Sequence, residues 1–333
     1  MTADVGDGLR ESAAVDPEGF FGPRSVAWRV LSAPATALMI AQITNLLEVP
    51  HSDFQAVLMG HDPLFPTNSK RQRGAGTAPD SKSGHFHDRL RRTVVVPLPI
   101  LFGDKQTATL AARKLFNYHR PMAGSRPGDG APYSATAAQS MLFASVTIAH
   151  AGLIAYEKYA LTDRRRPGRL TADERDQYFR EMAQLPLLMG VPSQDIPRSS
   201  AEVDRYYRSL SSKMTYLPGW RRAQRRTGSA LLRPDNATDI RSTLADIALM
   251  ISAVPAYAVL PTPSRRLHGI GSWADPVLKL VYVSSLPLFA LLRMRGVRRA
   301  ALAWYVGSHD AAVLEKAACR ARQRAVTIAD PVA

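Results

Sequence analysis

Residues 141–156, MLFASVTIAHAGLIAY, form a nearly continuous apolar run. Two further apolar stretches, 244–260 and 277–292, are interrupted by Asp246, Lys279 and prolines. No stretch reaches the roughly 18 uninterrupted apolar residues that indicate a transmembrane helix. We therefore expect these stretches to be buried helices, and the rest of the fold must enclose them.

The composition favours helices over sheets. Hydrophobic residues make up 46% of the 333 residues, but aromatic residues only 8%, so Leu, Ala, Val and Met must build much of the core. Such a mix favours helix, and no convincing alternation of apolar and polar residues predicts strands. The length suits one large domain or two intimate ones. The predicted fold class is all-α, with a single large helical domain.

Local signals indicate where helices begin and end. Pro97 and Pro99 must kink or end a helix, Asp104 is a predicted N-cap, and Thr171 with Glu174 forms a capping-box pattern. The expected helices cover 25–47, 85–102, 104–119, 134–159, 171 onward, 201–214, 240–254, 276–293 and 296–325. The expected loops and linkers cover 123–132, 163–169 and 255–273.

The chain divides into three predicted segments. Residues 1–20 form a polar, flexible leader, residues 21–255 the main helical domain, and residues 256–333 a basic helical extension packed on the core. Within the main domain, 66–84 is rich in Gly, Pro, Ser and Lys and lacks bulky apolar groups. It cannot bury enough surface to offset ordering, so we expect an exposed insertion.

The charge balance is strongly basic, with 43 Lys and Arg against 28 Asp and Glu, a net +15. The positive charge is spread over 164–166, 221–226 and 293–299, and no zinc-finger, RNA-recognition or basic-zipper signature is present. We therefore expect no specific nucleic-acid partner. A solvated, Arg-rich surface that touches the headgroups of an anionic membrane fits better.

Cysteine content and the N-terminal residues bear on localisation. Cys319 is the single cysteine, so no disulfide framework can form, which fits a reducing compartment. Residues 1–23 are polar, without the apolar segment of a secretory signal. We expect a cytoplasmic protein that can lie peripherally on the inner face of the membrane.

His119 lies on the apolar face of its expected helix. Counting back by four, seven, eight and eleven residues gives Leu115, Ala112, Ala111 and Ala108, which share one side of a 3.6-residue period. One interpretation is a core histidine that hydrogen-bonds a carbonyl. The other is a metal ligand, such as the axial ligand of haem iron, because neutral imidazole binds metals and small neighbours admit a flat group.

Other histidines and motifs give weaker signals. His150, within the apolar run, is either a core or a pocket-lining residue. His85 and His87 do not face each other on a helix, and no third metal ligand is evident nearby. No nucleophile elbow, P-loop, dinucleotide-binding glycine motif or H-E-x-x-H is present.

Arg89, Arg92 and Thr93 stand at i, i+3 and i+4, so they form one patch on a helix. Arginine binds carboxylates through a planar, permanently charged fork. The patch is either a cluster beside a cofactor or the solvated basic end of a helix.

Several short motifs follow in a fixed order: 21–30 (FGPRSVAWRV), 51–54 (HSDF), Arg89-x-x-Arg92-Thr93, 102–104 (FGD), His119 followed by Gly124, 132–135 (PYSA), 155–157 (AYE), 174–179 (ERDQYF) and 188–192 (LMGVP). Their order and spacing resemble the family that includes bacterial latex-clearing proteins and the mycophenolic-acid-pathway oxygenase. The resemblance covers roughly residues 20–215.

This resemblance implies a globin-like helical core that binds haem b. His119 matches the axial iron ligand, and Leu115 and Ala112 would lie beside the cofactor. Arg92 and Thr93 would shape the distal pocket, and Arg89 would position a propionate or the distal group. Characterised members cleave carbon–carbon double bonds of isoprenoid chains with dioxygen.

The chain also departs from the family. Ala123 and Phe116 stand where the family often has arginine. Phe143 and Ser145 stand where it often has a tryptophan and a histidine. For the acidic residue that acts as a base in rubber-cleaving members, Glu48 and Asp62 are both candidates.

Two hypotheses follow. The first is a haem b-dependent oxygenase that uses dioxygen on an apolar, isoprenoid or lipid-like substrate. Its pocket wall would include Met141, Leu142, Phe143 and Val146. The alternative is a non-catalytic haem- or lipid-binding helical protein on a membrane surface, which the altered family positions and the basic C-terminal helices favour. A helical scaffold without a cofactor is a third interpretation.

Overall fold

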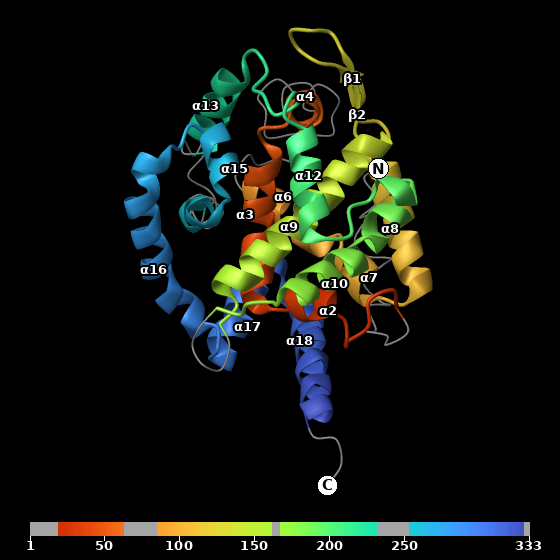
Figure 1. Cartoon of the computed structure of the whole chain (residues 1–333), viewed down its shortest axis with the longest axis vertical. Coiled ribbons are helices and arrows are strands. Elements are labelled where there is room, and N and C mark those ends of the chain that lie inside the picture. Colours follow the sequence, from red (N-terminus) through yellow and green to blue (C-terminus); the bar gives the residue numbers. More distant parts are fainter. Residues whose placement is uncertain (1–18, 63–84, 162–166, 232–252, 330–333) are drawn as a thin grey trace, which may run out of the picture.

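A computed structural model gives the architecture and describes residues 19–62, 85–161, 167–231 and 253–329. The predicted all-α class is confirmed, because helices form nearly every element (Figure 1). The helices are α2 (Val26–Leu31), α3 (Pro34–Glu48), α4 (Ser52–His61), α6 (His85–Val95), α7 (Leu98–Phe102), α8 (Lys105–His119), α9 (Ala138–Tyr159), α10 (Ala172–Met182), α11 (Gln184–Leu188), α12 (Ser200–Ser209), α13 (Trp220–Leu231), α15 (Thr262–Leu267), α16 (Asp275–Leu291), α17 (Arg295–Val306) and α18 (Ser308–Ala329).

The core is centred on the packing of α3 against α9, which cross in the middle of the molecule (Figure 1). Of the fifteen residues of α3, all but three are buried. The apolar run predicted to be a buried helix is the middle of α9, and this prediction is confirmed. Helices α2, α6 and α17 pack on this pair, with α10 and α18 against α2.

Local signals located several helix ends correctly. The Asp104 side chain accepts a 2.6 Å hydrogen bond from the Thr107 amide and so begins α8. Thr171 and Glu174 form the predicted capping box of α10. The segment with Pro97 and Pro99 divides into α6 and α7, because proline removes a helical hydrogen bond.

Several boundaries differ from the sequence prediction, and the connection expected over 255–273 contains the helix α15. The helix expected over 25–47 divides before Pro34, which occupies the first position of α3. The helix expected over 296–325 divides at Gly307, whose φ is +93°. The loop expected over 123–132 includes a short antiparallel hairpin of β1 (Ala123–Ser125) and β2 (Pro132–Ser134).

Several predicted segments lie outside the described residues. These are most of the leader, the insertion 66–84, part of the linker 163–169, and 240–252 of the helix expected over 240–254. Residues 253–259 are helical, with Ala256 and Val259 buried.

The C-terminal helices contribute to the main core. The Trp28 indole N–H donates a 2.9 Å hydrogen bond to the Ala317 carbonyl, which joins α2 to α18. Leu302, Tyr305 and Leu314 are almost wholly buried in the same cluster as α3 and α9. The region after residue 256 therefore shares one core with the first half of the chain.

The expectation that 277–292 is a buried helix is wrong. Among the described residues, two helices are long and apolar enough to cross a membrane, α9 and the segment 272–291. The apolar window of α9 is 67% buried, whereas that of 272–291 is only 11% buried. Helix α16 lies at the edge of the molecule and packs on the core through one face only (Figure 1).

Gly307 provides a test of the break between α17 and α18. With φ +93° and ψ 156°, it occupies a region that is essentially restricted to glycine. We predict that Gly307→Ala lowers the free energy of unfolding in urea by about 1–3 kcal/mol. Gly296→Ala is the matched control, because an added Cβ meets nothing within 4 Å there and alanine favours the helix. Equal effects of the two substitutions would contradict the proposed strain.

Candidate functional site

His119, the last residue of α8, has one defined polar partner. Its Nδ1 lies 2.9 Å from the Leu115 carbonyl oxygen, one turn earlier. A carbonyl only accepts, so in the neutral imidazole Nδ1 carries the proton and Nε2 carries the lone pair. Burial lowers the pKa of His119, although the hydrogen bond to Leu115 opposes this, and so favours the neutral form.

The face of α8 that was predicted to be apolar does face the core. Ala108, Ala111 and Ala112 are buried, and Leu115 is partly buried against the core. Phe116, which stands where the sequence comparison above expected an arginine, also packs against the hydrophobic core. His119 itself is only partly buried at the end of this face, and its ring contacts that of Tyr118 edge to face.

The three residues predicted to form one patch all lie on α6, but their side chains differ in environment. Arg89 forms an ion pair of 3.0 Å with Asp62. Thr93 Oγ1 donates a 3.2 Å hydrogen bond to the Arg89 carbonyl, within the helix. Arg92 is exposed, and Arg91 donates to the Val306 carbonyl of α17. Of the two predicted arginines, Arg89 thus faces inward.

Glu48 ends α3 and is only 7% exposed. Thr147 Oγ1 of α9 donates a 2.8 Å hydrogen bond to Glu48 Oε1. Burial raises the pKa of Glu48 to about 7, although the Thr147 hydrogen bond and the charge of Arg89 act in the opposite direction. A carboxyl group that titrates near neutral pH is suited to accept or release a proton.

Two core histidines pack against aromatic rings, and one of these rings, Tyr207, interacts electrostatically with Glu48. The His51 ring stacks on Phe143 with centroids 4.2 Å apart, and burial lowers the pKa of His51 to about 4. His150 lies 5.3 Å from the Tyr207 ring. Among the described residues, the buried His150 Nδ1 and Tyr207 hydroxyl have no hydrogen-bond partner. Such unsatisfied buried polar atoms are characteristic of functional sites and of water or ligand positions.

The structure thus brings Arg89 together with both candidate bases. Arg89 pairs directly with Asp62 and acts on Glu48 through its charge. His119 contacts Leu115 and Tyr118 of its own helix, and α8 packs mainly on α7. The described contacts do not join His119 to the Arg89 group. Sequence reasoning offered Glu48 only as a guess, although it is the one charged residue of α3.

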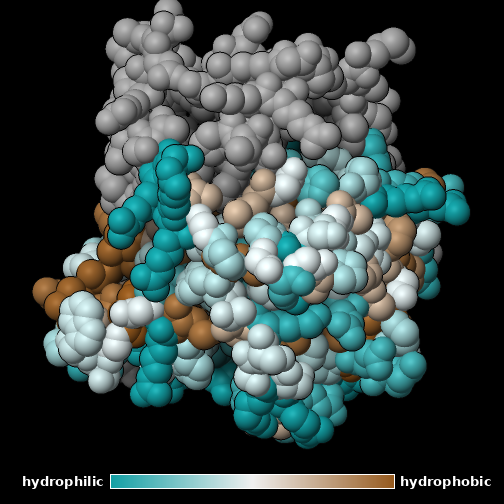
Figure 2. All heavy atoms as spheres, turned by 90° about the horizontal axis from the view of Figure 1, so that it is seen from above, coloured by the Kyte–Doolittle hydropathy of each residue, from teal (hydrophilic) through white to brown (hydrophobic). Residues whose placement is uncertain are grey.

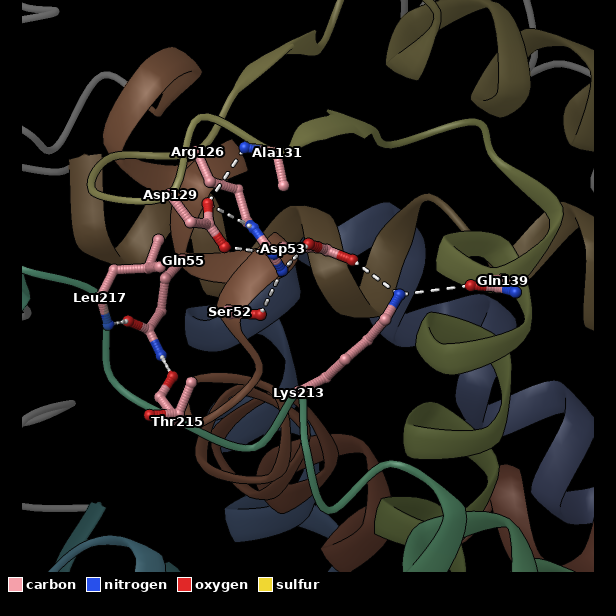
Figure 3. A network of polar contacts seen from close by, with 10 residues as sticks. All are labelled: Ser52, Asp53, Gln55, Arg126, Asp129, Ala131, Gln139, Lys213, Thr215 and Leu217. Atoms are coloured by element: carbon pink, nitrogen blue, oxygen red, sulfur yellow. Dashed lines mark hydrogen bonds and ion pairs between the residues drawn. The ribbon is translucent and has the colours of Figure 1, made fainter.

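The HSDF motif lies in a network that connects distant parts of the chain (Figure 3). Arg126, which directly follows β1 in the loop of the β-hairpin, donates hydrogen bonds to Ser52 and Asp53. Lys213 pairs with the other Asp53 carboxylate oxygen at 3.1 Å and also reaches Gln139 (Figure 3). Asp53 therefore pairs with two cationic side chains, Arg126 and Lys213, and holds the segment that carries His51 in place.

The predicted pocket wall is buried. Met141, Leu142 and Phe143 belong to the interior, and Val146 with Ser145 lines a small apolar cavity between α9, α10, α11 and α12. Within the described ranges, no three His, Cys, Asp or Glu side chains are grouped to hold a metal ion. A single histidine such as His119 would need the remaining iron ligands to come from a prosthetic group.

The ionisation of Glu48 predicts how stability depends on pH. Between its ordinary pKa of 4.5 and about 7, the unfolded chain releases the Glu48 proton while the folded chain retains it. Stability relative to Glu48→Gln should therefore fall as pH rises through this window, by about 3 kcal/mol, and level off above it.

Urea unfolding across this pH range measures that difference. Asp173→Asn, an acid-to-amide substitution at an exposed position, is the control for the change of side chain itself. A pH-independent difference for Glu48→Gln would show that burial does not perturb this carboxyl.

The comparisons with known proteins identify the family of this chain. The family model for the ER-bound oxygenase mpaB/B'/Rubber oxygenase, catalytic domain, matches residues 23–290. The match extends through α16 and includes α3, α6, α8 and α9, which carry the residues described above. No curated protein and no solved structure matches the chain. The chain therefore belongs to the mpaB and rubber oxygenase catalytic-domain family.

Proposed function

We propose that this protein is a haem b-dependent oxygenase that uses dioxygen to oxidise an apolar, isoprenoid or lipid-like substrate. Membership of an oxygenase catalytic-domain family supports the oxygenase activity. The observation that carries the haem proposal is the Nδ1 hydrogen bond of His119, which leaves Nε2 for a metal.

His119 suits the role of axial ligand for three reasons. The Leu115 carbonyl fixes the tautomer and the ring orientation, as a second hydrogen bond commonly does for metal-binding histidines. Burial favours the neutral imidazole, which is the form that binds a metal. Leu115, one turn before His119, is an apolar and only partly buried side chain that a flat macrocycle would contact. Haem would supply the dioxygen and redox chemistry.

Among the residues that the structure describes, Glu48 is the one best suited to move a proton. Thr147 orients its carboxyl group, and its pKa of about 7 allows it to act as a base at neutral pH. We assign the base to Glu48 rather than to Asp62, because Asp62 forms a direct ion pair with Arg89. In this assignment the positive charge of Arg89 limits how far burial raises the pKa of Glu48. Arg92 contributes to the positive surface.

The apolar substrate class rests on the side chains around these groups. Phe143 and Val146 of α9 are buried beside Thr147, and the small cavity next to Val146 includes Phe179 and Met182. These side chains offer few hydrogen bonds to a polar substrate, while the cavity itself, about 10 Å³, has room for one water molecule. The globin-like arrangement of the core stays a prediction from family resemblance.

The visible spectrum tests the ligand assignment. We predict that the protein loaded with hemin has a Soret band, and that His119→Ala loses it while keeping the parent's helical circular dichroism. His309→Ala is the matched control, because His309 is exposed at the start of α18 and should leave the band unchanged. An unchanged Soret band in His119→Ala would contradict the assignment.

Dioxygen consumption tests the role of Glu48. With an unsaturated isoprenoid substrate, Glu48→Gln should retain the Soret band and lose at least about 100-fold in kcat. The rate of the parent should rise as pH passes about 7, because the base must be ionised. Asp62→Asn is the comparison, and a larger loss there than in Glu48→Gln would overturn the choice of base. A Soret band without turnover would instead indicate a non-catalytic haem carrier.

A further inference from the structure

Helix α16 presents an exposed apolar face along its whole length. Val277, Leu280, Val283, Leu288 and Leu291 are 47–68% exposed. Their spacing of three to five residues places them on one side of the helix. We call these five residues the α16 face.

The opposite side of α16 is fixed to the core. Leu278 and Ser285 are buried, and Tyr282 and Phe289 contact the Tyr159 ring at centroid distances of 5.8 and 4.2 Å. Because these contacts hold one side of α16 against the protein, the helix can lie along an apolar phase but cannot cross it. The α16 face is thus arranged for a surface contact.

Large exposed apolar side chains also precede and follow the helix in the sequence. Trp273, just before α16, is 76% exposed, and Met294 and Trp304 follow at 58% and 51%. Figure 2 shows hydrophobic surface at the left edge of the molecule, the side on which Figure 1 places α16. Tryptophan is favoured where apolar and aqueous phases meet, because its ring is apolar and its N–H is polar.

The charge around the α16 face is positive. Between residues 272 and 309 the one acidic residue is Asp275, which pairs with Arg265 at 2.8 Å. Arg293, Arg295 and Arg299 are exposed where α16 meets α17. Any surface that covers the α16 face must therefore tolerate or attract cations at its edge.

A second cationic region borders α16 on another side. A surface hollow beside Tyr282 is lined by Glu157, Lys158, Pro167, Arg169 and Arg175. Glu157 pairs with Arg175 at 2.8 Å, so Lys158 and Arg169 leave the hollow net positive. The first cationic region lies at the C-terminal end of α16, and the second lies beside Tyr282 in the middle of the helix.

We infer that the α16 face docks this protein on the surface of a lipid bilayer that contains anionic phospholipids. Aliphatic side chains on one helix face, tryptophan near the helix and arginines at its end are typical of helices that lie in the bilayer interface. Anionic headgroups complement both cationic regions. A second copy of this chain fits less well, because two molecules of net +15 would bring like charges together.

Cosedimentation of the full chain with vesicles tests this inference. The protein should bind vesicles of phosphatidylcholine with phosphatidylglycerol, bind phosphatidylcholine alone more weakly, and dissociate as salt increases. A double substitution, Leu280→Asp with Leu288→Asp, should weaken binding at least about tenfold. Leu110→Asp is the matched control, because Leu110 is 52% exposed on α8, and it should bind as the parent does.

Tryptophan fluorescence reports the same contact without disturbing the aliphatic residues. Trp28 and Trp220 are buried, so Trp273 and Trp304 should give most of a blue shift on adding anionic vesicles, and Trp273→Phe should reduce it. No binding to anionic vesicles, or equal binding by the parent and the double variant, overturns the inference. Self-association that the double variant abolishes, without vesicle binding, overturns it in favour of an interface between copies.

Discussion

The packing of α3 against α9 is the constraint on which the rest of the structure depends. Both helices are apolar on nearly every side, so each must be surrounded, and α2, α6 and α17 close around them. Burial of these side chains supplies the main driving force for folding. Glu48 and Thr147 form a hydrogen bond across this interface. Placing a carboxyl group there costs free energy, because burial disfavours its charged form.

The burial of Glu48 is also the basis of its proposed role as a base. The same burial that shields Glu48 brings its pKa to about 7, and Arg89 on α6 provides the nearest opposing charge. His119 lies apart, at the end of α8, with a tautomer fixed by its own helix. The family match covers all four helices that carry these groups. In the function that we propose, His119 would bind a metal and Glu48 would move a proton within one oxygenase-family domain.

Local sequence signals predicted local structure well. The caps at Asp104 and Thr171 and the face of α8 depend on neighbours within one or two turns, so the sequence contains them. The pairing of Arg89 with Asp62 joins segments that the sequence separates, and no spacing rule reveals it. The exposure of α16 was not predictable either. A helix that is apolar on every side has the same pattern whether protein or another apolar phase surrounds it.

The central claim is that His119 holds the iron of a haem group. Its most direct test is a crystal structure of the hemin-loaded protein with diffraction data collected at the iron absorption edge. We predict a single strong anomalous peak next to Nε2 of His119, with Nδ1 still bound to the Leu115 carbonyl. A peak beside another histidine, such as His150 or His51, would show that His119 is not the iron ligand.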